Sequence, residues 1–226
     1  MLALAASACG TGESQPTAAR SGPGATAGSA ADRSVARTDV DGDGQLDEVY
    51  YRVVDADRSK VIVRTSTSER LVKPLSTTFW PRGQWHGATR LDGRAGAELV
   101  IGTWQGAHTP MFTVLTYRFG DLEVMDNPAG IYGRLWPIDA FYNGYLGWTR
   151  TVEDGEVRLT LRSVLRTGQT KEFTGEAEHF RWAGNGWVRA GVEPISVRGD
   201  KRAAQIGGWH VKGLPSWPPA LAATGA

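Results

Sequence analysis

The residues with the clearest chemistry are the aspartates of the segment 39–47, which reads DVDGDGQLD. Asp39, Asp41 and Asp43 stand two residues apart, and Gly44 follows where a sharp turn needs a residue without a Cβ. Like charges at this spacing repel one another, and a hard cation that takes oxygen ligands neutralises them. The segment therefore predicts a metal loop, with Ca²⁺ as the ion.

The positions that supply ligands in such a loop are filled, in order, by Asp39, Asp41, Asp43, Gln45 and Asp47. Gln45 would offer its backbone carbonyl, and Asp47 would close the site. An EF-hand would also need a bidentate glutamate inside a helix at the twelfth position, but Tyr50 stands there. Residues 49–54 are β-branched and aromatic, which is typical of a strand. We expect a calcium loop followed by a strand; the alternative is a solvated acidic turn.

A displacement of 51 residues aligns this loop with a second segment, residues 90–102. The aligned pairs are Asp41 with Asp92, Gly42 with Gly93, Asp47 with Glu98, and Val49 with Val100. Arg90 and Arg94 replace two of the aspartates, so we expect no metal in the second loop. Either a guanidinium takes the place of the cation by pairing with Asp92 and Glu98, or the loop is an ordinary exposed one.

The two segments resemble the calcium-binding units of FG-GAP/VCBS-type repeat proteins, in particular lipoproteins of the actinobacterial type. The resemblance covers residues 36–125. It implies a mainly β fold of repeated antiparallel sheets with a partial β-propeller-like architecture. The chain is too short for a full ring of seven blades, so the resemblance implies no closed ring.

The N-terminal residues 1–9 predict a location for the protein. Small residues precede Cys9, the only cysteine, as in a bacterial lipobox whose cysteine is lipidated. The alternative is an alanine-rich disordered terminus. With a lipid on Cys9, the protein would be extracytoplasmic and anchored to the outer face of the cell membrane. Residues 10–36 are rich in Gly, Ser, Ala and Pro, which predicts a flexible linker that reaches on the order of 30 Å.

The remainder divides into a β-rich domain at 37–215 and a disordered tail at 216–226. The folded structure is expected to begin at about Ser34, within the last residues of the linker. The expected strands are Glu48–Val54, Lys60–Ser66, Glu98–Trp104, Met111–Tyr117, Gly120–Val124, Gly147–Val152, Val157–Arg162, Glu178–Trp182 and Trp187–Ala190. The turn at 183–186, AGNG, joins the last two strands as a hairpin. No window has the periodicity of an amphipathic helix of ordinary length.

Nine tryptophans are many for 226 residues. They either fill the cores between sheets or present rings that stack on sugars or hold a peptide. If a second site exists, we expect it at two loops, 84–87 and 106–110, which contain Trp85, His86 and His108, together with Trp104 and Gln105 just before the second loop.

No catalytic motif is recognisable, so we expect no enzyme. The formal net charge of +1 gives no reason to expect nucleic acid as a partner. We expect a monomeric binding or scaffold domain that is stabilised by calcium and meets an unknown protein or glycan at the cell surface. The alternative is an extracytoplasmic hydrolase or a carbohydrate-binding module that uses the loops bearing tryptophan and histidine.

Overall fold

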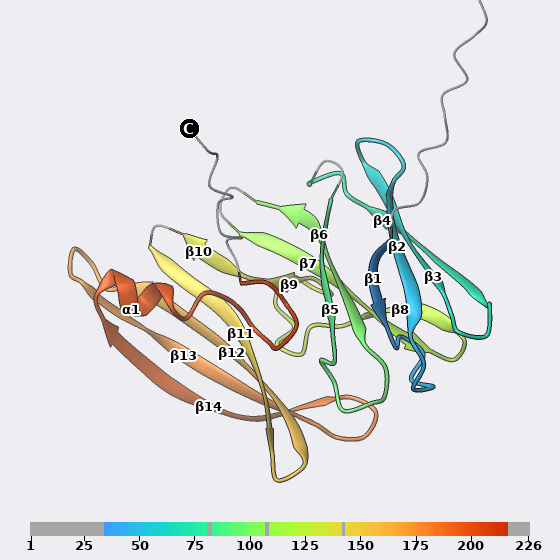
Figure 1. Cartoon of the computed structure of the whole chain (residues 1–226). Coiled ribbons are helices and arrows are strands. Elements are labelled where there is room, and N and C mark those ends of the chain that lie inside the picture. The colour runs from blue at the N-terminus through green and yellow to red at the C-terminus, as the bar shows by residue number, and fades with distance from the viewer. Residues whose placement is uncertain (1–33, 81–82, 107–108, 142, 217–226) are drawn as a thin grey trace, which may run out of the picture. The chain divides into compact units, whose positions relative to one another are not determined.

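A computed structural model describes residues 34–80, 83–106, 109–141 and 143–216. Cys9, residues 1–9, most of the predicted linker and nearly all of the predicted tail lie outside the described residues. The described part is mainly β, as predicted, and consists of three sheets, none of which closes into a barrel (Figure 1). No helix in the described ranges is both long enough and apolar enough to cross a membrane.

The first two sheets are antiparallel meanders. The first contains β1 (Ser34–Thr38), β2 (Asp47–Val53), β3 (Arg58–Arg64) and β4 (Arg70–Ser76) in chain order. The second contains β5 (Gln84–Thr89), β6 (Glu98–Gln105), β7 (Pro110–Arg118) and β8 (Asp121–Met125), and the short β9 (Trp136–Pro137) pairs with β7. The two predicted loops are the β1–β2 and β5–β6 connections, so each loop joins the first two strands of a sheet.

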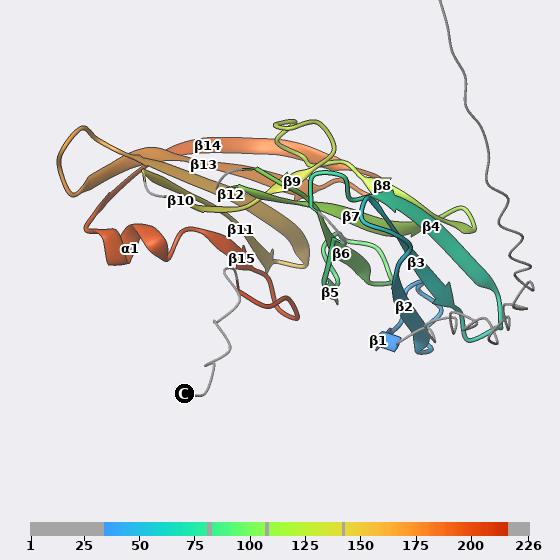
Figure 2. The ribbon, with the colours of Figure 1, turned by 90° about the horizontal axis from the view of Figure 1, so that it is seen from above.

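The third sheet follows the order β10 (Asp139–Phe141), β11 (Gly144–Glu153), β12 (Glu156–Arg166), β13 (Glu172–Trp182) and β14 (Trp187–Arg198). The strand β15 (Gly208–His210) adds to β11 in the parallel sense. The one described helix, α1 (Asp200–Ala204), lies against one face of this sheet (Figure 2). Ala203 of α1 packs there with Val164 and Phe173.

Two larger cores join neighbouring sheets. One core combines strands of the first and second sheets through residues such as Val49, Val63, Leu99 and Leu115. The other combines the second and third sheets and is dominated by aromatic rings. The second sheet therefore packs on both faces, which is why β6 and β7 are buried over nearly their whole length and read as continuous apolar runs.

The tryptophans in the described part of the chain differ in burial. Trp136, Trp148 and Trp209 are almost completely buried, and the rings of Trp136 and Trp148 lie 4.9 Å apart. Trp80, Trp85 and Trp187 are half-buried against the two larger cores, and Trp104 and Trp182 are half-buried as well. Burial in the core thus accounts for some of the tryptophans, whereas others keep part of their ring surface in solvent.

Each predicted strand coincides with an observed one, but most are longer than predicted. Sequence reasoning missed the strands β1, β4, β5, β9, β10 and β15 and the helix α1. β1 begins at Ser34, the first described residue, where the folded part was expected to begin, so it overlaps the end of the segment 10–36 that was assigned to the linker. β1, β4 and β5 mix polar and apolar residues without a clean alternation, and pairing with a neighbour decides their conformation.

Replacement of Trp148 by alanine should lower the free energy of unfolding by about 3–5 kcal/mol, because it empties the centre of the aromatic core and removes the hydrogen bond from Nε1 to the carbonyl of Pro137. Chemical denaturation followed by circular dichroism measures the loss. Leu165→Ala, at a 59% exposed position of the same sheet, is the control and should change it by less than about 1 kcal/mol. Equal losses would contradict this account of the core.

Candidate metal centre

The β1–β2 loop brings three of the predicted ligands together. Asp39, Asp41 and Asp43 each offer a carboxylate oxygen, and these oxygens all lie within 4.8 Å of one another. Asp39 and Asp41 are half-buried, and Asp43 is exposed. A cluster made only of carboxylate oxygens suits a hard cation such as Ca²⁺.

The loop holds this arrangement through hydrogen bonds from its own backbone to the aspartates. The N–H of Gly42 donates to Oδ1 of Asp39 at 2.7 Å, and the N–H of Gly44 donates to Oδ2 of Asp39 at 3.2 Å. Asp41 and Asp43 each accept a bond from the residue two positions later. Gly44 has a φ of 86°, so the turn uses the conformational freedom that the sequence predicted there.

Asp47 has a different environment from the other aspartates. It is fully buried, and its Oδ2 accepts hydrogen bonds from the N–H of Val40 at 2.7 Å and of Asp41 at 3.4 Å. Its Oδ1 accepts the N–H of Ser66 at 2.9 Å. Asp47 lies outside the group of three clustered carboxylates, and its visible role is to tie the start of the loop to the β3–β4 turn.

Gln45, the predicted carbonyl ligand, is exposed, and its N–H donates to Oδ1 of Asp43 at 2.7 Å. The other oxygen of Asp43 accepts the hydroxyl of Ser66 at 2.7 Å. That hydroxyl lowers the pKa of Asp43. Ser66 is a contributor to the loop that sequence reasoning missed, because it comes from a turn that only the sheet brings near.

The charges of the cluster are poorly compensated. Burial, followed by repulsion from Asp47, Asp43 and Asp39, raises the pKa of Asp41. The nearest cationic group among the recorded ion pairs is the 65% exposed side chain of Arg90, whose Nη2 lies 3.9 Å from Oδ2 of Asp39. A guanidinium that lies mostly in solvent at that distance contributes little, so the excess of negative charge remains.

The β5–β6 loop repeats the main hydrogen bonds of the first loop at positions 51 residues away. Oε2 of Glu98 accepts the N–H of Leu91 at 2.6 Å and the N–H of Asp92 at 3.4 Å, as Asp47 does from Val40 and Asp41. Glu98 is also buried, and its Oε1 accepts the hydroxyl of Thr116 at 3.0 Å. A buried carboxylate thus holds the backbone of both loops.

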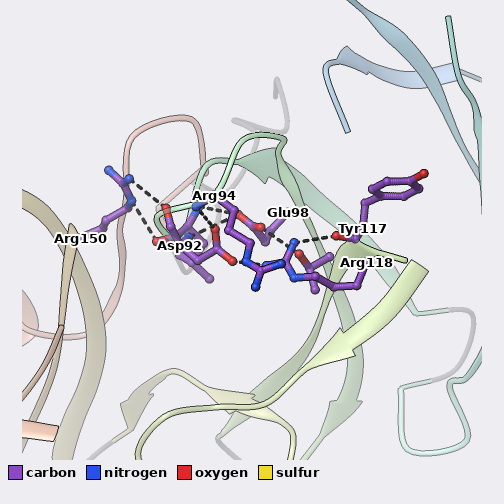
Figure 3. Close-up of polar contacts among 8 residues, drawn as sticks. Asp92, Arg94, Glu98, Tyr117, Arg118 and Arg150 are labelled. Carbon is purple, nitrogen blue, oxygen red and sulfur yellow. Dashed lines mark hydrogen bonds and ion pairs between the residues drawn. The ribbon is translucent and has the colours of Figure 1, made fainter. Parts of the chain in front are cut away.

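The second loop contains its own cation. The guanidinium of Arg118, at the end of β7, forms a buried ion pair with Asp92 and also donates to the carbonyl of Tyr117 at 2.6 Å (Figure 3). Arg150 of β11 approaches from the other side and donates to the carbonyls of Leu91 at 3.0 Å and of Asp92 at 3.3 Å. Of the two expectations for this loop, the ion pair between a guanidinium and Asp92 agrees better with the structure than an ordinary exposed loop does.

The arginine that forms this pair differs from the two that the aligned sequence points to. Arg94 contributes its backbone N–H to Oδ1 of Asp92 at 2.6 Å, whereas Arg90 reaches toward Asp39 of the first loop. Thr67 stands 51 residues before Arg118, so the first loop has no guanidinium at the matching position. The alignment of the loops could not find Arg118 because it lies in the next hairpin.

The two loops also contact each other. The N–H of Ala97 donates to the carbonyl of Asp39 at 2.7 Å. Together with the approach of Arg90 to Asp39, this bond places the acidic cluster at the junction of the first and second sheets. A change in the charge of the first loop therefore acts on the contact between two sheets.

The described residues of the second predicted site differ in their environments. His86 is buried against Phe112, with ring centroids 4.8 Å apart, and burial lowers its pKa to about 4. Trp104 and Gln105 lie at the far end of β6, and His108 is outside the described residues. A neutral histidine inside an aromatic core is a packing residue, whereas Trp85 and Trp104 are half-buried and Gln105 is exposed.

Comparison of the chain with protein families, with curated proteins and with solved structures gives no match in any of the three.

Arg118→Gln should destabilise the protein by about 3–5 kcal/mol, because it leaves the buried carboxylate of Asp92 without its cation. The matched control is Arg134→Gln, which breaks the ion pair between Arg134 and Asp126. These two side chains are 60% and 72% exposed, so the loss in free energy of unfolding should stay within about 1 kcal/mol. Urea denaturation of both variants measures the difference. Similar costs for the two would show that Arg118 does not compensate a buried charge.

The stability of the protein should depend on the protonation of Glu98. Burial, followed by repulsion from Asp92, raises the pKa of Glu98 from 4.5 to about 7. The folded state then binds more protons than the unfolded state between these two values, so stability falls as pH rises from about 4.5 to about 7. The slope for one proton is at most about 1.4 kcal/mol per pH unit.

The measurement is the difference in free energy of unfolding between the parent and Glu98→Gln, which keeps an acceptor oxygen but does not titrate. His86 makes an opposite contribution, because its lowered pKa costs stability as pH falls from 6.5 to about 4. His86 is present in both proteins, so its contribution cancels when the free energy of one is subtracted from that of the other. The parent should lose stability relative to the variant as pH rises toward 7. A difference that is flat with pH would mean that Glu98 is charged throughout.

Proposed function

We propose that this chain is a calcium-stabilised binding or scaffold domain held at the cell surface by a lipid on Cys9. Ca²⁺ is the proposed ion, and Asp39, Asp41 and Asp43 are its proposed ligands. The role of the ion is structural: it sets the β1–β2 loop so that β2 enters the sheet in register. The sequence of residues 1–9 is what supports the lipid anchor and the extracytoplasmic location.

The observation that carries the calcium proposal is the contrast between the two loops. Both loops fix their backbone with a buried carboxylate; the first presents three aspartates at the turn, and the second presents one, Asp92. The second loop neutralises Asp92 with Arg118, whereas the first keeps three carboxylates within 4.8 Å and has an exposed arginine at 3.9 Å. A bound divalent cation would neutralise the carboxylates of the first loop, as the guanidinium of Arg118 neutralises Asp92 in the second.

The arrangement of strands supports the proposed partial β-propeller-like architecture. The first sheet is a four-stranded meander, and the second is a four-stranded meander to which β9 adds beside β7. The acidic loops join the first two strands of each, and the third sheet begins as a further meander. β1 contacts β5, so the first strands of neighbouring sheets lie close together, as they do in a propeller. Such an arrangement presents loops and grooves between sheets, which suits a binding or scaffold role.

Calcium should raise the unfolding temperature of the full chain, because an ion that binds only the folded state stabilises it by about 2.7 kcal/mol at a hundredfold excess over its dissociation constant. Differential scanning calorimetry is carried out with calcium, with magnesium and with chelator. Asp41→Asn removes one proposed ligand and should abolish the calcium shift while it relieves the repulsion without metal.

Asp126→Asn is the matched control, because Asp126 is 72% exposed and outside the cluster; it should keep the full shift. The lack of any shift in the parent at millimolar calcium would refute the proposal and leave the loop as a solvated acidic turn. An equal shift in parent and Asp41→Asn would place the ion elsewhere.

A further inference from the structure

Two aromatic rings stand at the surface where the first and second sheets meet. Phe79 follows β4 and is 63% exposed, which is unusual for a phenylalanine, and Trp104 near the end of β6 is half-buried. Their ring centroids lie 5.8 Å apart at an interplanar angle of 48°. Neither ring belongs to the aromatic core, so burial on folding does not explain the pair.

The backbone holds these rings in place. The N–H of Gln105 donates to the carbonyl of Phe79 at 3.0 Å, and Phe79 forms a parallel bridge with Trp104. β6 has a bulge between Gly102 and Trp104, and such a bulge changes the face to which the following side chain points. The ring of Trp80 covers Gly102 so closely that a Cβ there would lie 2.4 Å from it. Trp80 therefore covers this part of β6, while the bulge turns Trp104 toward the surface.

A groove of about 360 Å³ lies beside the two rings. The described residues that line it carry no charge: they are aliphatic or aromatic, or they bear a hydroxyl, as Thr103 and Thr113 do. The hydroxyls of these two threonines are 2.8 Å apart, so they form a polar pair within an otherwise apolar wall. Aromatic surface combined with neutral hydroxyls suits a ligand that has both apolar faces and hydroxyl groups.

This groove continues past the end of β4. A second cavity of about 730 Å³ shares four lining residues with the first, namely Pro74, Leu75, Ser76 and Thr78. Its far side carries the charged residues Asp55, Asp57, Arg58 and Lys60, and Asp55 and Arg58 pair with each other. Along the combined groove, the lining changes from aromatic and hydroxyl-bearing side chains to charged side chains that can form hydrogen bonds with hydroxyl groups, as a site for a chain of several units would.

We propose that this groove binds a neutral oligosaccharide, with one sugar ring against Phe79 and Trp104 and the following units along the end of β4. This inference names the ligand class of the proposed binding function and rests on it. Among the described residues that line the aromatic end, an anionic chain would find no cation, and a lipid would leave unused the hydrogen-bonding capacity that remains on the paired hydroxyls of Thr103 and Thr113. A sugar ring offers C–H groups to the aromatic faces and hydroxyls to the threonines.

The test is isothermal titration of the full chain, with calcium present, with neutral hexasaccharides of β-1,4-glucose, α-1,4-glucose and β-1,4-N-acetylglucosamine. Phe79→Ala and Trp104→Ala should each weaken binding by about tenfold or more, which corresponds to about 1.4 kcal/mol. Trp182→Ala removes a half-buried tryptophan of the third sheet that does not line the groove, and it should leave the affinity unchanged.

Phe79 is exposed, so Phe79→Ala should fold like the parent, and its unchanged unfolding temperature checks this. Binding of a hexasaccharide that Phe79→Ala and Trp104→Ala both weaken supports the proposal. No saturable binding of any of the three at millimolar concentration, or binding that neither variant weakens, overturns it. The shift of the unfolding temperature with calcium is measured on the same samples. A calcium shift without sugar binding rejects the groove proposal and leaves the calcium site standing. Sugar binding without a calcium shift rejects the calcium site and leaves the groove proposal standing.

Discussion

A buried carboxylate that accepts backbone N–H groups is the interaction on which both loops depend. Asp47 and Glu98 stand at the first residue of β2 and of β6, and each accepts two N–H groups from the loop that precedes it. Those N–H groups would otherwise be buried without partners, which costs free energy. The solution brings a negative charge into the core, however, and that charge must be compensated.

The two loops meet this requirement differently. In the second loop, the raised pKa of Glu98 and the ion pair of Arg118 with Asp92 reduce the buried negative charge. In the first loop, Asp47 is held by three N–H groups, and the excess charge lies in the aspartate cluster toward solvent. An external cation would neutralise charge only in the first loop, where the carboxylates have no buried cation beside them. The proposed ion site therefore belongs to the first loop alone.

The same loops connect the sheets. The first loop contacts the second through the N–H of Ala97, and Arg150 of the third sheet donates to two carbonyls of the second loop. Polar contacts thus follow the same path as the two cores, from the first sheet through the second to the third. An ion in the first loop would stabilise a junction between sheets, and the proposed groove lies at another junction of the same two sheets.

The sequence determined the local features. The spacing of the aspartates, the glycine at the turn and the β-branched run after Asp47 were enough to predict a loop followed by a strand, and the mainly β fold with its longest strands followed from the same patterns. These features depend on residues that are close in the chain, where the geometry of a turn or strand is set by the residues themselves.

Tertiary structure decided which side chains complete each site. Arg118 and Ser66 reach the two loops from neighbouring hairpins, and Asp47 accepts backbone N–H groups instead of joining the three clustered carboxylates. The exposed pair of Phe79 and Trp104 depends on a bulge and on the meeting of two sheets. No local pattern encodes such contacts, because sheet register and packing between sheets are settled only when the whole chain competes for the same buried surface.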